Sequence, residues 1–431
     1  MKPRSPHYTC KGTRLAFSHG ASLLRRSSPG YEGRAPAAFS KAGKLRIPIM
    51  SSSNSLAPAP AFDYPEAHNH SRIIMDTSSN GIQSQPLTGF WYAALLSSEV
   101  RAGQMKGQTL AGLPLVICRD RQGRVAALRD ICPHRAMPLS FGCFDGERIE
   151  CSYHGWQFDT GGRCRDIPAL VTDSGVQPEK IGVTTYPARD KDGYVWVYVP
   201  GKQGVPASLP EPPALPVLSK SYRTLHISVP LTSTLDNGLV GLIDPAHGPF
   251  VHRSPWWRSR ATIREKSKTY EPLPLGFRMV SHPASSNSSV YKLVGLSGGA
   301  PTVTIDFLLP NIRIETIQSG SQWFLSRAMI TPISDTECRM DFCAAWDCLR
   351  WLPFSKTLLR LFGRAFLNQD TSVMAQQAIG LRHNPPLMLV GDPDAPAKWY
   401  VKLKAAYLAA EQHGGALDHP LKGPVTLRWR T

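Results

Sequence analysis

The sequence lacks any apolar run long enough to cross a bilayer. A membrane-spanning helix needs about 20 consecutive apolar residues, whereas the densest apolar run, Leu113 to Cys118, has the length of a strand. Hydrophobic residues make up 42% of the 431 residues and charged residues 19%. This ordinary composition excludes a wholly disordered or fibrous chain. We therefore expect a soluble globular protein without a transmembrane segment, long enough for two or three domains.

Acidic residues are scarce: the sequence has 32 Asp and Glu against 49 Lys and Arg, a formal net charge of +17. Residues 1–60 contain ten of the basic residues and a single acid, Glu32, so they carry +9 of this charge. The remainder of the chain is only modestly basic, which is typical of a solvated surface or of one that docks an acidic partner. We therefore expect no nucleic-acid partner.

The first 80 residues also lack sustained apolar periodicity. They contain no apolar segment of about 7–15 residues, which a secretory signal would have. Their composition, rich in Ser, Ala, Pro and Arg, predicts a disordered basic leader or extension over residues 1–80, with Met50 or Met75 as an alternative start. An acid-poor, Arg- and Ser-rich segment also fits an organelle transit peptide. We expect a cytoplasmic protein, with organelle targeting as the alternative.

Two common redox motifs are absent. No G-x-G-x-x-G follows an apparent strand, so the sequence has no nicotinamide or flavin fingerprint. It also has no C-x4-C-x2-C of the plant-type ferredoxins. The nine cysteines are odd in number and spread along the chain, which argues against a disulfide framework and for a reducing compartment. Some cysteines are therefore available to hold a metal.

Regular structure is predicted from Phe90 onward. Up to about residue 199, short β-type segments alternate with Gly or Asp turns, which predicts a small antiparallel β-domain over residues 85–203. A Pro-rich stretch at 204–219 indicates a linker. The expected strands in the chain include Leu113–Cys118, Val125–Leu128, Arg148–Cys151, Tyr194–Val199, Val303–Leu309, Ile312–Gln318 and Ala328–Pro332.

Residues 220–412 mix β-type segments with helical periodicity. The helical segments are expected over 235–247, 351–377 and 399–412, because their apolar residues recur with a 3.6-residue period. This pattern predicts an α+β domain in which helices cover an antiparallel sheet. Residues 413–431 are expected to form a C-terminal tail.

Two short Cys/His segments form the first candidate metal site. Cys132-Pro133-His134 is followed, after sixteen residues, by Cys151-Ser152-Tyr153-His154. Two Cys and two His could hold a structural zinc ion, but zinc fingers place the two Cys together and the two His together. One Cys and one His on each loop suits a [2Fe–2S] cluster with one iron on two Cys and the other on two His.

The residues that flank these ligands resemble the paired loops of the Rieske oxygenases. Respiratory Rieske proteins have an additional disulfide-forming Cys in each loop, and Met137 and Tyr153 stand at those places here. The resemblance therefore implies the lower-potential oxygenase branch. Cys143 and Cys164 lie outside the ligand spacing and are expected to be small buried residues.

A second constellation combines Asp244, His247 and His252 with the distant Asp370. Non-haem iron that activates O2 is commonly held by two His and one carboxylate on one face. We expect His247 to end the helix that begins near Leu235, and Pro249 to break that helix so that His252 returns beside His247. Asp370, on the amphipathic stretch 366–377, is the candidate carboxylate.

Residues 244–252 resemble the iron motif of the Rieske non-haem iron oxygenases, the ring-hydroxylating oxygenase α subunits, and the resemblance extends over about residues 85–400. It implies an all-β Rieske domain followed by a helix-grip, START-like catalytic domain. It also implies that His247, His252 and Asp370 hold a mononuclear non-haem Fe(II), and that Asp244 connects an iron-ligating His with a cluster-ligating His of a neighbouring subunit. The family commonly has Asn three residues before this Asp, where Gly241 stands here.

The resemblance implies a terminal oxygenase that uses O2 and electrons from an external NAD(P)H-dependent reductase or ferredoxin. A small cyclic or aromatic substrate would be hydroxylated or demethylated, as in the monooxygenase, O-demethylase and pheophorbide-oxygenase-like branch, by a homotrimer. A dihydroxylating dioxygenase α subunit, a Rieske electron carrier and a zinc-stabilised binding module remain alternatives. The aromatic and basic residues considered for the substrate pocket are Phe250, Trp256, Trp257, Phe307, Arg258 and Arg260.

Overall fold

The computed structural model of this chain describes residues 73–75, 85–216, 219–252, 260–285, 291, 295, 299–348 and 354–431. The described residues all belong to one compact unit, His70–Thr431. The leader predicted over residues 1–80 therefore lies outside the described residues, except for strand β1 (Ile73–Met75), which pairs with β20 (Leu387–Leu389). In the described part of the chain, no helix is both long and apolar enough to cross a membrane.

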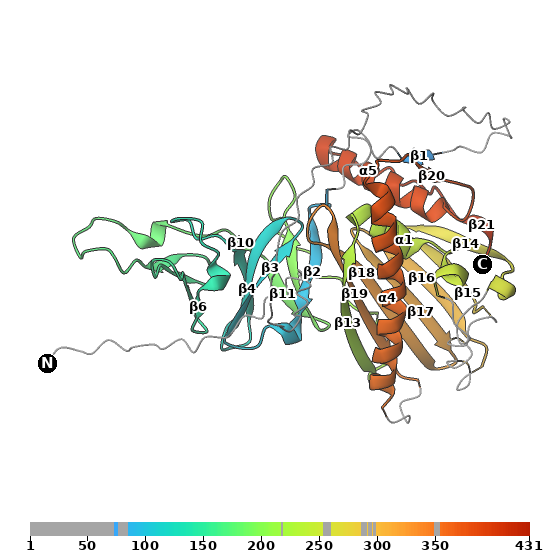
Figure 1. The fold of residues 1–431 in the computed structure, drawn as a ribbon, viewed down its shortest axis with the longest axis horizontal. Helices are drawn as coiled ribbons and strands as arrows, with labels where there is room; N and C mark the ends of the chain where they lie inside the picture. Colours follow the sequence, from blue (N-terminus) through green and yellow to red (C-terminus); the bar gives the residue numbers. More distant parts are fainter. Residues whose placement is uncertain are drawn as a thin grey trace, which may run out of the picture. The chain divides into compact units, whose positions relative to one another are not determined.

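The N-terminal part of this unit contains three small antiparallel sheets (Figure 1, blue to green). Their strand orders are β10-β5-β4-β3, β11-β12-β2 and β6-β7-β8-β9. The strands are β2 (Phe90–Leu96), β3 (Gln104–Leu110), β4 (Leu113–Arg119), β5 (Val125–Arg129), β6 (Cys143–Phe144), β7 (Arg148–Glu150), β8 (Gln157–Asp159), β9 (Cys164–Asp166), β10 (Thr185–Tyr186), β11 (Ala188–Lys191) and β12 (Tyr194–Val199), with 3-10 turns η1 (Ser97–Glu99), η2 (Leu139–Phe141) and η3 (Pro178–Lys180). The predicted strands of this region are all present.

The C-terminal part is built on an eight-stranded antiparallel sheet of order β13-β19-β18-β17-β16-β15-β14-β21. Its strands are β13 (Arg223–Thr232), β14 (Glu265–Leu273), β15 (Gly276–Pro283), β16 (Thr302–Leu308), β17 (Ile312–Ser319), β18 (Gln322–Pro332), β19 (Glu337–Trp346) and β21 (Val425–Arg430). The helices of this part whose bounds lie within the described residues are α1 (Leu235–Ile243), α2 (Gly248–Val251), α4 (Ser355–Leu381) and α5 (Ala395–His413), with the 3-10 turn η4 (Arg260–Thr262).

Helices cover one face of this sheet (Figure 1). Leu239 of α1, Leu367 of α4 and Leu403 of α5 are buried in one apolar core with the sheet residues that point toward them. Trp196 of β12, in the N-terminal part, is buried in a second core on the opposite face, together with Leu325 of β18. The predicted α+β architecture, an all-β domain followed by an antiparallel sheet with helices, is confirmed.

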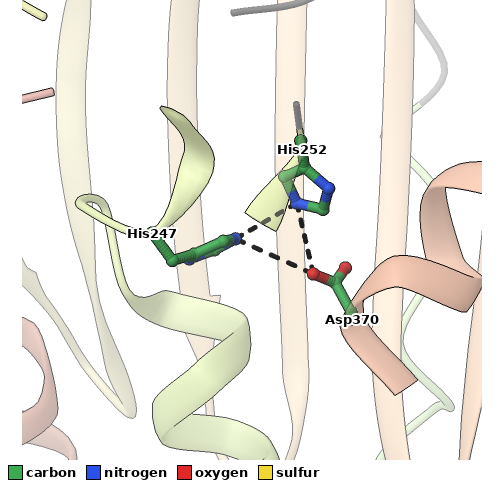
Figure 2. Close-up of side chains that lie close together, drawn as sticks. All are labelled: His247, His252 and Asp370. Carbon is green, nitrogen blue, oxygen red and sulfur yellow. Dashed lines mark hydrogen bonds and ion pairs between the residues drawn. The ribbon is translucent and has the colours of Figure 1, made fainter. Parts of the chain in front are cut away.

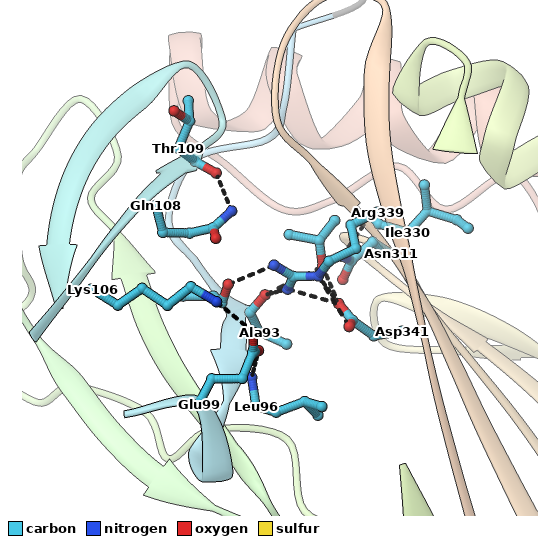
Figure 3. A network of polar contacts seen from close by, with 12 residues as sticks. Ala93, Leu96, Glu99, Lys106, Gln108, Thr109, Asn311, Ile330, Arg339 and Asp341 are labelled. Atoms are coloured by element: carbon cyan, nitrogen blue, oxygen red, sulfur yellow. Dashed lines mark hydrogen bonds and ion pairs between the residues drawn. The ribbon is translucent and has the colours of Figure 1, made fainter. Parts of the chain in front are cut away.

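Arg339 of β19 connects the sheet to the N-terminal part (Figure 3). Its guanidinium donates hydrogen bonds to the backbone carbonyls of Ala93 (2.8 Å) and Ala94 (2.7 Å) in β2. The same group pairs at 2.8 Å with Asp341, whose side chain is 1% exposed. Burial opposes the charged form of Arg339, but the Asp341 carboxylate outweighs it and raises the pKa of the guanidinium. A fully paired charge at this position fixes the two parts against each other.

Three predictions about this part of the chain differ from the structure. The helix expected over residues 235–247 ends at Ile243, because Pro245 disfavours the α conformation of the preceding residue and Asp244 is extended (φ −64°, ψ 120°). Pro249 does not break that helix but stands in the first turn of α2, where its missing N–H has no cost. The predicted tail contains β21, an edge strand that pairs with β14 and buries Leu427 and Trp429.

Candidate metal centres

The two Cys/His loops have the same backbone hydrogen bonds. In the first, Cys132 N–H donates to Met137 O (2.8 Å) and Ala136 N–H donates to Cys132 O (2.9 Å). In the second, Cys151 N–H donates to Trp156 O (2.9 Å) and Gly155 N–H donates to Cys151 O (3.0 Å). Ala136 and Gly155, at equivalent places, adopt positive φ values of 56° and 70°. The two loops therefore have the same backbone turn, each beginning at a Cys, as two halves of one site require.

The four predicted cluster residues lie together at these loops. The Cys132 and Cys151 thiols are buried, and burial, reinforced by the adjacent Cys151 thiol, raises the pKa of Cys132. The His134 and His154 rings lie 4.5 Å apart between centroids, and Trp156 stacks on His134 at 4.6 Å. His134 Nδ1 is buried and has no hydrogen-bond partner within the described residues. An orphaned imidazole nitrogen beside two buried thiols fits a [2Fe–2S] cluster held by two Cys and two His.

The predicted iron ligands converge on one point (Figure 2). His252 Nε2 lies 3.2 Å from His247 Nε2 and 3.2 Å from Asp370 Oδ1. His247 Nε2 lies 3.9 Å from Asp370 Oδ1. Ligand atoms about 2.1 Å from a metal, at right angles to each other, are separated by about 3 Å. This triangle therefore has the dimensions of one face of a metal's coordination shell.

Three elements bring these ligands together. His247 lies in the short connection between α1 and α2, His252 directly follows α2, and Asp370 is on α4. Since Asp244 is extended, the chain leaves the axis of α1 there, and the Asp244 Oδ1 atom accepts a hydrogen bond from Ala246 N–H (2.7 Å). The bend thus presents His247 to α4, and His252 stacks on Phe366 of that helix at 3.8 Å.

Two neighbours determine which nitrogen of each imidazole carries the proton. An amide oxygen only accepts hydrogen bonds, so His252 Nδ1, 3.0 Å from Gln369 Oε1, carries the proton and leaves Nε2 unprotonated toward the centre. On the other side, Asp244 Oδ2 lies 3.5 Å from His247 Nδ1. Burial lowers the pKa of His247, but the Asp244 and Asp370 carboxylates outweigh burial and raise it. In the neutral form of each ring, Nδ1 faces an acceptor and Nε2 presents the lone pair that a metal requires. The raised pKa of His247 means that a metal competes with a proton for this ring.

A buried charged group holds α1 in place. Lys404 of α5 is fully buried and its ammonium lies 2.7 and 2.9 Å from the two carboxylate oxygens of Asp236 in α1. The Tyr400 hydroxyl donates a further hydrogen bond to the same carboxylate. No local pattern in the sequence predicts this pair, because Asp236 and Lys404 are 168 residues apart. The role of Gln369 is not predicted either. It is adjacent to Asp370, but the sequence gives no sign that its amide reaches His252.

The candidate pocket residues and the two non-ligand cysteines lie at separate places in the structure. Phe307 is buried in the wall of a small cavity beside Asp244. Phe250 is 45% exposed, with the Arg260 guanidinium 5.5 Å from the centre of its ring, and Cys164 is buried as expected. Cys143 is only half-buried. Trp256, Trp257 and Arg258 lie outside the described residues.

Replacing Gln369 with Leu is expected to lower the affinity of the chain for Fe(II) about 10- to 100-fold, because His252 loses the acceptor that fixes its tautomer. The measurement is Fe(II) titration of the metal-free protein. Gln369→Glu, which keeps an acceptor, is expected to retain the affinity. Gln376→Leu, an exposed change on the same helix, is the matched control. An unchanged affinity in Gln369→Leu would show that the Gln369 contact does not position His252.

Comparison with known proteins identifies the N-terminal part. The Rieske [2Fe–2S] domain family matches residues 90–187. Chlorophyllide a oxygenase of Oryza sativa subsp. japonica is 30% identical over 305 residues, which are 68% of this chain and 51% of that protein. The oxygenase component of dicamba O-demethylase from Stenotrophomonas maltophilia is 35% identical over 172 residues, 38% of this chain and 47% of that protein. The matches thus span about half the length of each relative.

Solved structures with the same fold cover more of the chain. The crystal structure of dicamba monooxygenase bound to dicamba superimposes with a TM-score of 0.61, at 23% identity, over 74% of this chain and 98% of that one. NdmA of Pseudomonas putida CBB5 with caffeine gives a TM-score of 0.63 at 19% identity, over 78% of this chain and 96% of the other. The Rieske domain implies a [2Fe–2S] cluster, and the catalytic domains of Rieske oxygenases bind a mononuclear non-haem iron. The Rieske domain and the relatives together show that this chain belongs to the Rieske non-haem iron oxygenases.

Proposed function

We propose that the chain is the terminal oxygenase of a Rieske system, which uses O2 and electrons from an external reductase or ferredoxin to hydroxylate or demethylate a cyclic organic substrate. The observation that carries the proposal is the convergence of His247, His252 and Asp370, with their ligand atoms all within 4.8 Å of one another. A pure electron carrier would need only the Rieske domain and would have no use for a second, separate set of ligands.

In this proposal, the cofactors are held by the residues that the sequence predicts. Two Cys and two His hold the [2Fe–2S] cluster, and His247, His252 and Asp370 hold the mononuclear Fe(II). When bound, the iron supplies O2 activation and the cluster supplies electrons. The cluster ligands are Cys132, His134, Cys151 and His154.

The chain's own residues orient and protect this chemistry. Asp244 holds the proton on His247 Nδ1, and a carboxylate between two imidazoles couples their protonation to each other. Its side chain is 33% exposed, so an imidazole of a neighbouring subunit can reach it, and we propose a head-to-tail homotrimer on that basis. Phe277 and Phe307 provide an apolar wall beside Asp244, which excludes water from the reacting position.

The electron donor and the location belong to the same proposal. Because the chain carries an excess of basic residues, an acidic reductase or ferredoxin is the expected partner. The expected location is cytoplasmic. The alternative, an organelle, is supported by the basic leader and by the chloroplastic relatives, chlorophyllide a oxygenase and Protein TIC 55 of Arabidopsis thaliana.

The test is turnover of the reconstituted full chain with a reductase, NADH, ¹⁸O2 and a panel of methoxylated and unsubstituted aromatic acids. Mass spectrometry is expected to detect ¹⁸O in a hydroxylated product, or formaldehyde from a methoxy group. His252→Ala is expected to abolish the product while reduction of the cluster continues, because only the mononuclear site is lost. Product formation that survives His252→Ala would contradict the proposal, and reduction of the cluster without any oxygenated product in the wild-type chain would favour an electron carrier.

A further inference from the structure

Helix α4 presents large apolar side chains to solvent in its N-terminal half. Leu358, Leu361 and Phe362 are 49, 64 and 58% exposed, and Phe354, at the N-cap, is 83% exposed. The Leu358 N–H donates to Phe354 O (3.0 Å), so Phe354 lies one turn before Leu358. Side chains three or four residues apart share one face of a helix. These four side chains, here called the apolar row, therefore form one continuous surface.

The opposite face of α4 packs against the sheet (Figure 1). Leu367 is buried, and Leu359 is partly buried, in the core that α4 shares with the sheet. At Gly363 the helix comes so close to β13 that a Cβ atom would lie 2.7 Å from Ile227 Cδ1. Gly363 follows Leu361 by two residues, which is more than half a turn. The apolar row therefore points away from the sheet, and packing on the sheet does not explain its composition.

The exposed apolar surface is confined to this half of the helix. Toward the C-terminus the same face carries Asn368, Ser372 and Gln376, which are polar and exposed. The Gln376 amide donates a hydrogen bond to the Ser372 hydroxyl at 3.4 Å. Single exposed apolar residues, such as Ile379 in the second half of α4, are normal on a protein surface. A contiguous apolar patch, in contrast, marks an interaction site.

Basic residues run beside the apolar row. Lys356, Arg360 and Arg364, here called the basic row, are spaced four residues apart and are exposed. Residues 355–369 contain no acidic residue, and within the described residues no acidic partner contacts the basic row. The amino end of a helix adds a partial positive charge. This half of α4 therefore combines an apolar surface with positive charge that no neighbouring acid balances in the described part of the chain.

Three kinds of partner are compatible with an apolar surface of this size. A symmetric contact with a second copy would place one basic row against another, which is repulsive. An acidic redox partner must reach the cluster loops, residues 132–134 and 151–154, which belong to the N-terminal sheets and not to α4. An anionic lipid surface matches both rows, because apolar side chains enter the boundary between head groups and acyl chains while Lys and Arg are attracted to the negative charge.

We propose that residues 354–364 dock the chain on the surface of an anionic membrane, with the apolar row among the head groups and the basic row against lipid phosphates. Guanidinium groups bind phosphate oxygens through paired hydrogen bonds, and Arg360 and Arg364 supply two such groups. The contact is peripheral, since in the part of the chain that the structure describes no helix is long and apolar enough to span a bilayer.

This docking surface lies on the helix that carries one of the proposed iron ligands. Asp370 follows Phe362 by eight residues, which is about 12 Å along the helix axis. Docking would therefore bring the candidate iron site close to the lipid surface. The inference goes beyond the proposed function and does not depend on it, because neither row contains a proposed metal ligand.

The first experiment measures binding of the full chain to unilamellar vesicles by co-sedimentation. Vesicles of phosphatidylcholine and phosphatidylglycerol in a ratio of about 2:1 are compared with vesicles of phosphatidylcholine alone. Binding to the anionic vesicles is expected to be about tenfold or more tighter, and added NaCl is expected to weaken it because salt screens exposed charges. The basic leader, residues 1–60, is common to the wild type and all variants, so only ratios between chains are interpreted.

Variants test each row separately. Leu361→Ser with Phe362→Ser is expected to weaken binding to the anionic vesicles about tenfold or more, because two apolar side chains no longer enter the lipid. Arg360→Gln with Arg364→Gln is expected to weaken it about 30-fold, since each basic residue near an anionic surface contributes roughly fivefold. Circular dichroism establishes that each variant is folded before binding is compared.

A matched control changes the other end of the same helix. Ile379→Ser with Arg382→Gln replaces one exposed apolar and one exposed basic residue and is expected to bind as the wild type does. Equal binding of the wild type and both row variants would overturn the proposal, as would a wild-type chain that binds neither kind of vesicle.

Two further measurements separate the remaining explanations. Sedimentation velocity is run without lipid: an assembly of the wild-type chain that Leu361→Ser with Phe362→Ser breaks down would show that a second copy covers the apolar row, and would overturn the proposal. Turnover of a water-soluble substrate is expected to be the same in the wild type and the row variants. Docking that is lost in the row variants of a chain without oxygenase activity would leave the docking surface intact and contradict the proposed function alone.

Discussion

Replacing Asp244 with Asn is expected to lower turnover by about 10²- to 10⁴-fold, the size of effect that a positioned acid–base group typically provides. The Asp244 carboxylate lies 3.5 Å from His247 Nδ1, and we propose that it orients this imidazole while the other nitrogen faces the ligand cluster. An amide of the same shape keeps the packing but cannot carry the negative charge. The measurement is single-turnover product formation, with iron and sulfide content determined on the same sample.

The metal content distinguishes the two roles that Asp244 could have. We expect Asp244→Asn to retain the [2Fe–2S] cluster and the mononuclear iron, because none of the proposed ligands changes. Asp173→Asn, in an exposed loop of the Rieske domain, is the matched control and is expected to behave as wild type. If iron is lost in parallel with turnover, Asp244 only supports the fold of the site, and the proposed coupling is contradicted.

Replacing Lys404 with Met is expected to lower the free energy of unfolding by about 3–5 kcal/mol. The Lys404 side chain is fully buried and contacts both carboxylate oxygens of Asp236 at 2.7 and 2.9 Å. Its removal leaves a negative charge in the core, and among the described residues the Tyr400 hydroxyl is then its remaining side-chain partner. Urea denaturation followed by circular dichroism measures the change.

Two further variants test the cause of this destabilisation. Adding Asp236→Asn to Lys404→Met is expected to recover a large part of the loss, since the buried charge is then removed. Lys402→Met, an exposed change on the same helix, is expected to shift stability by less than about 0.5 kcal/mol. A loss in Lys404→Met that the second substitution does not relieve would show that lost packing, and not the unpaired carboxylate, causes it.

The sequence predicts the ligand types because metal ligands lie close together in short sequence motifs, and it predicts the fold class from the periodicity of apolar residues. Cys132 and His134 are two residues apart, and His247 and His252 five, so single loops reveal each half of a site. Apolar periodicity likewise predicts the strands and the helices α4 and α5 within a few residues. β21 also has a strand pattern, since Leu427 and Trp429 alternate with polar residues. The prediction of a tail over residues 413–431 did not include it.

Other features depend on contacts that no local pattern records. The contact of Arg339 with Ala93 joins residues 246 apart, and that of Gln369 with His252 joins residues 117 apart. Both become evident only when the sheet and helices are assembled. The end of α1 is a different case, because the effect of Pro245 on Asp244 is local and overrides the apolar periodicity that continues to His247.

The most direct test of the account is the metal and acid-labile sulfide content of the purified full chain, with EPR spectroscopy of the dithionite-reduced sample. The account predicts about three irons and two sulfides per chain, from one [2Fe–2S] cluster and one mononuclear site, with the spectrum of mixed Cys and His ligation. Zinc without sulfide would contradict it outright. Two irons with the Rieske spectrum, and no third iron taken up by the chain when Fe(II) is supplied, would contradict the mononuclear centre.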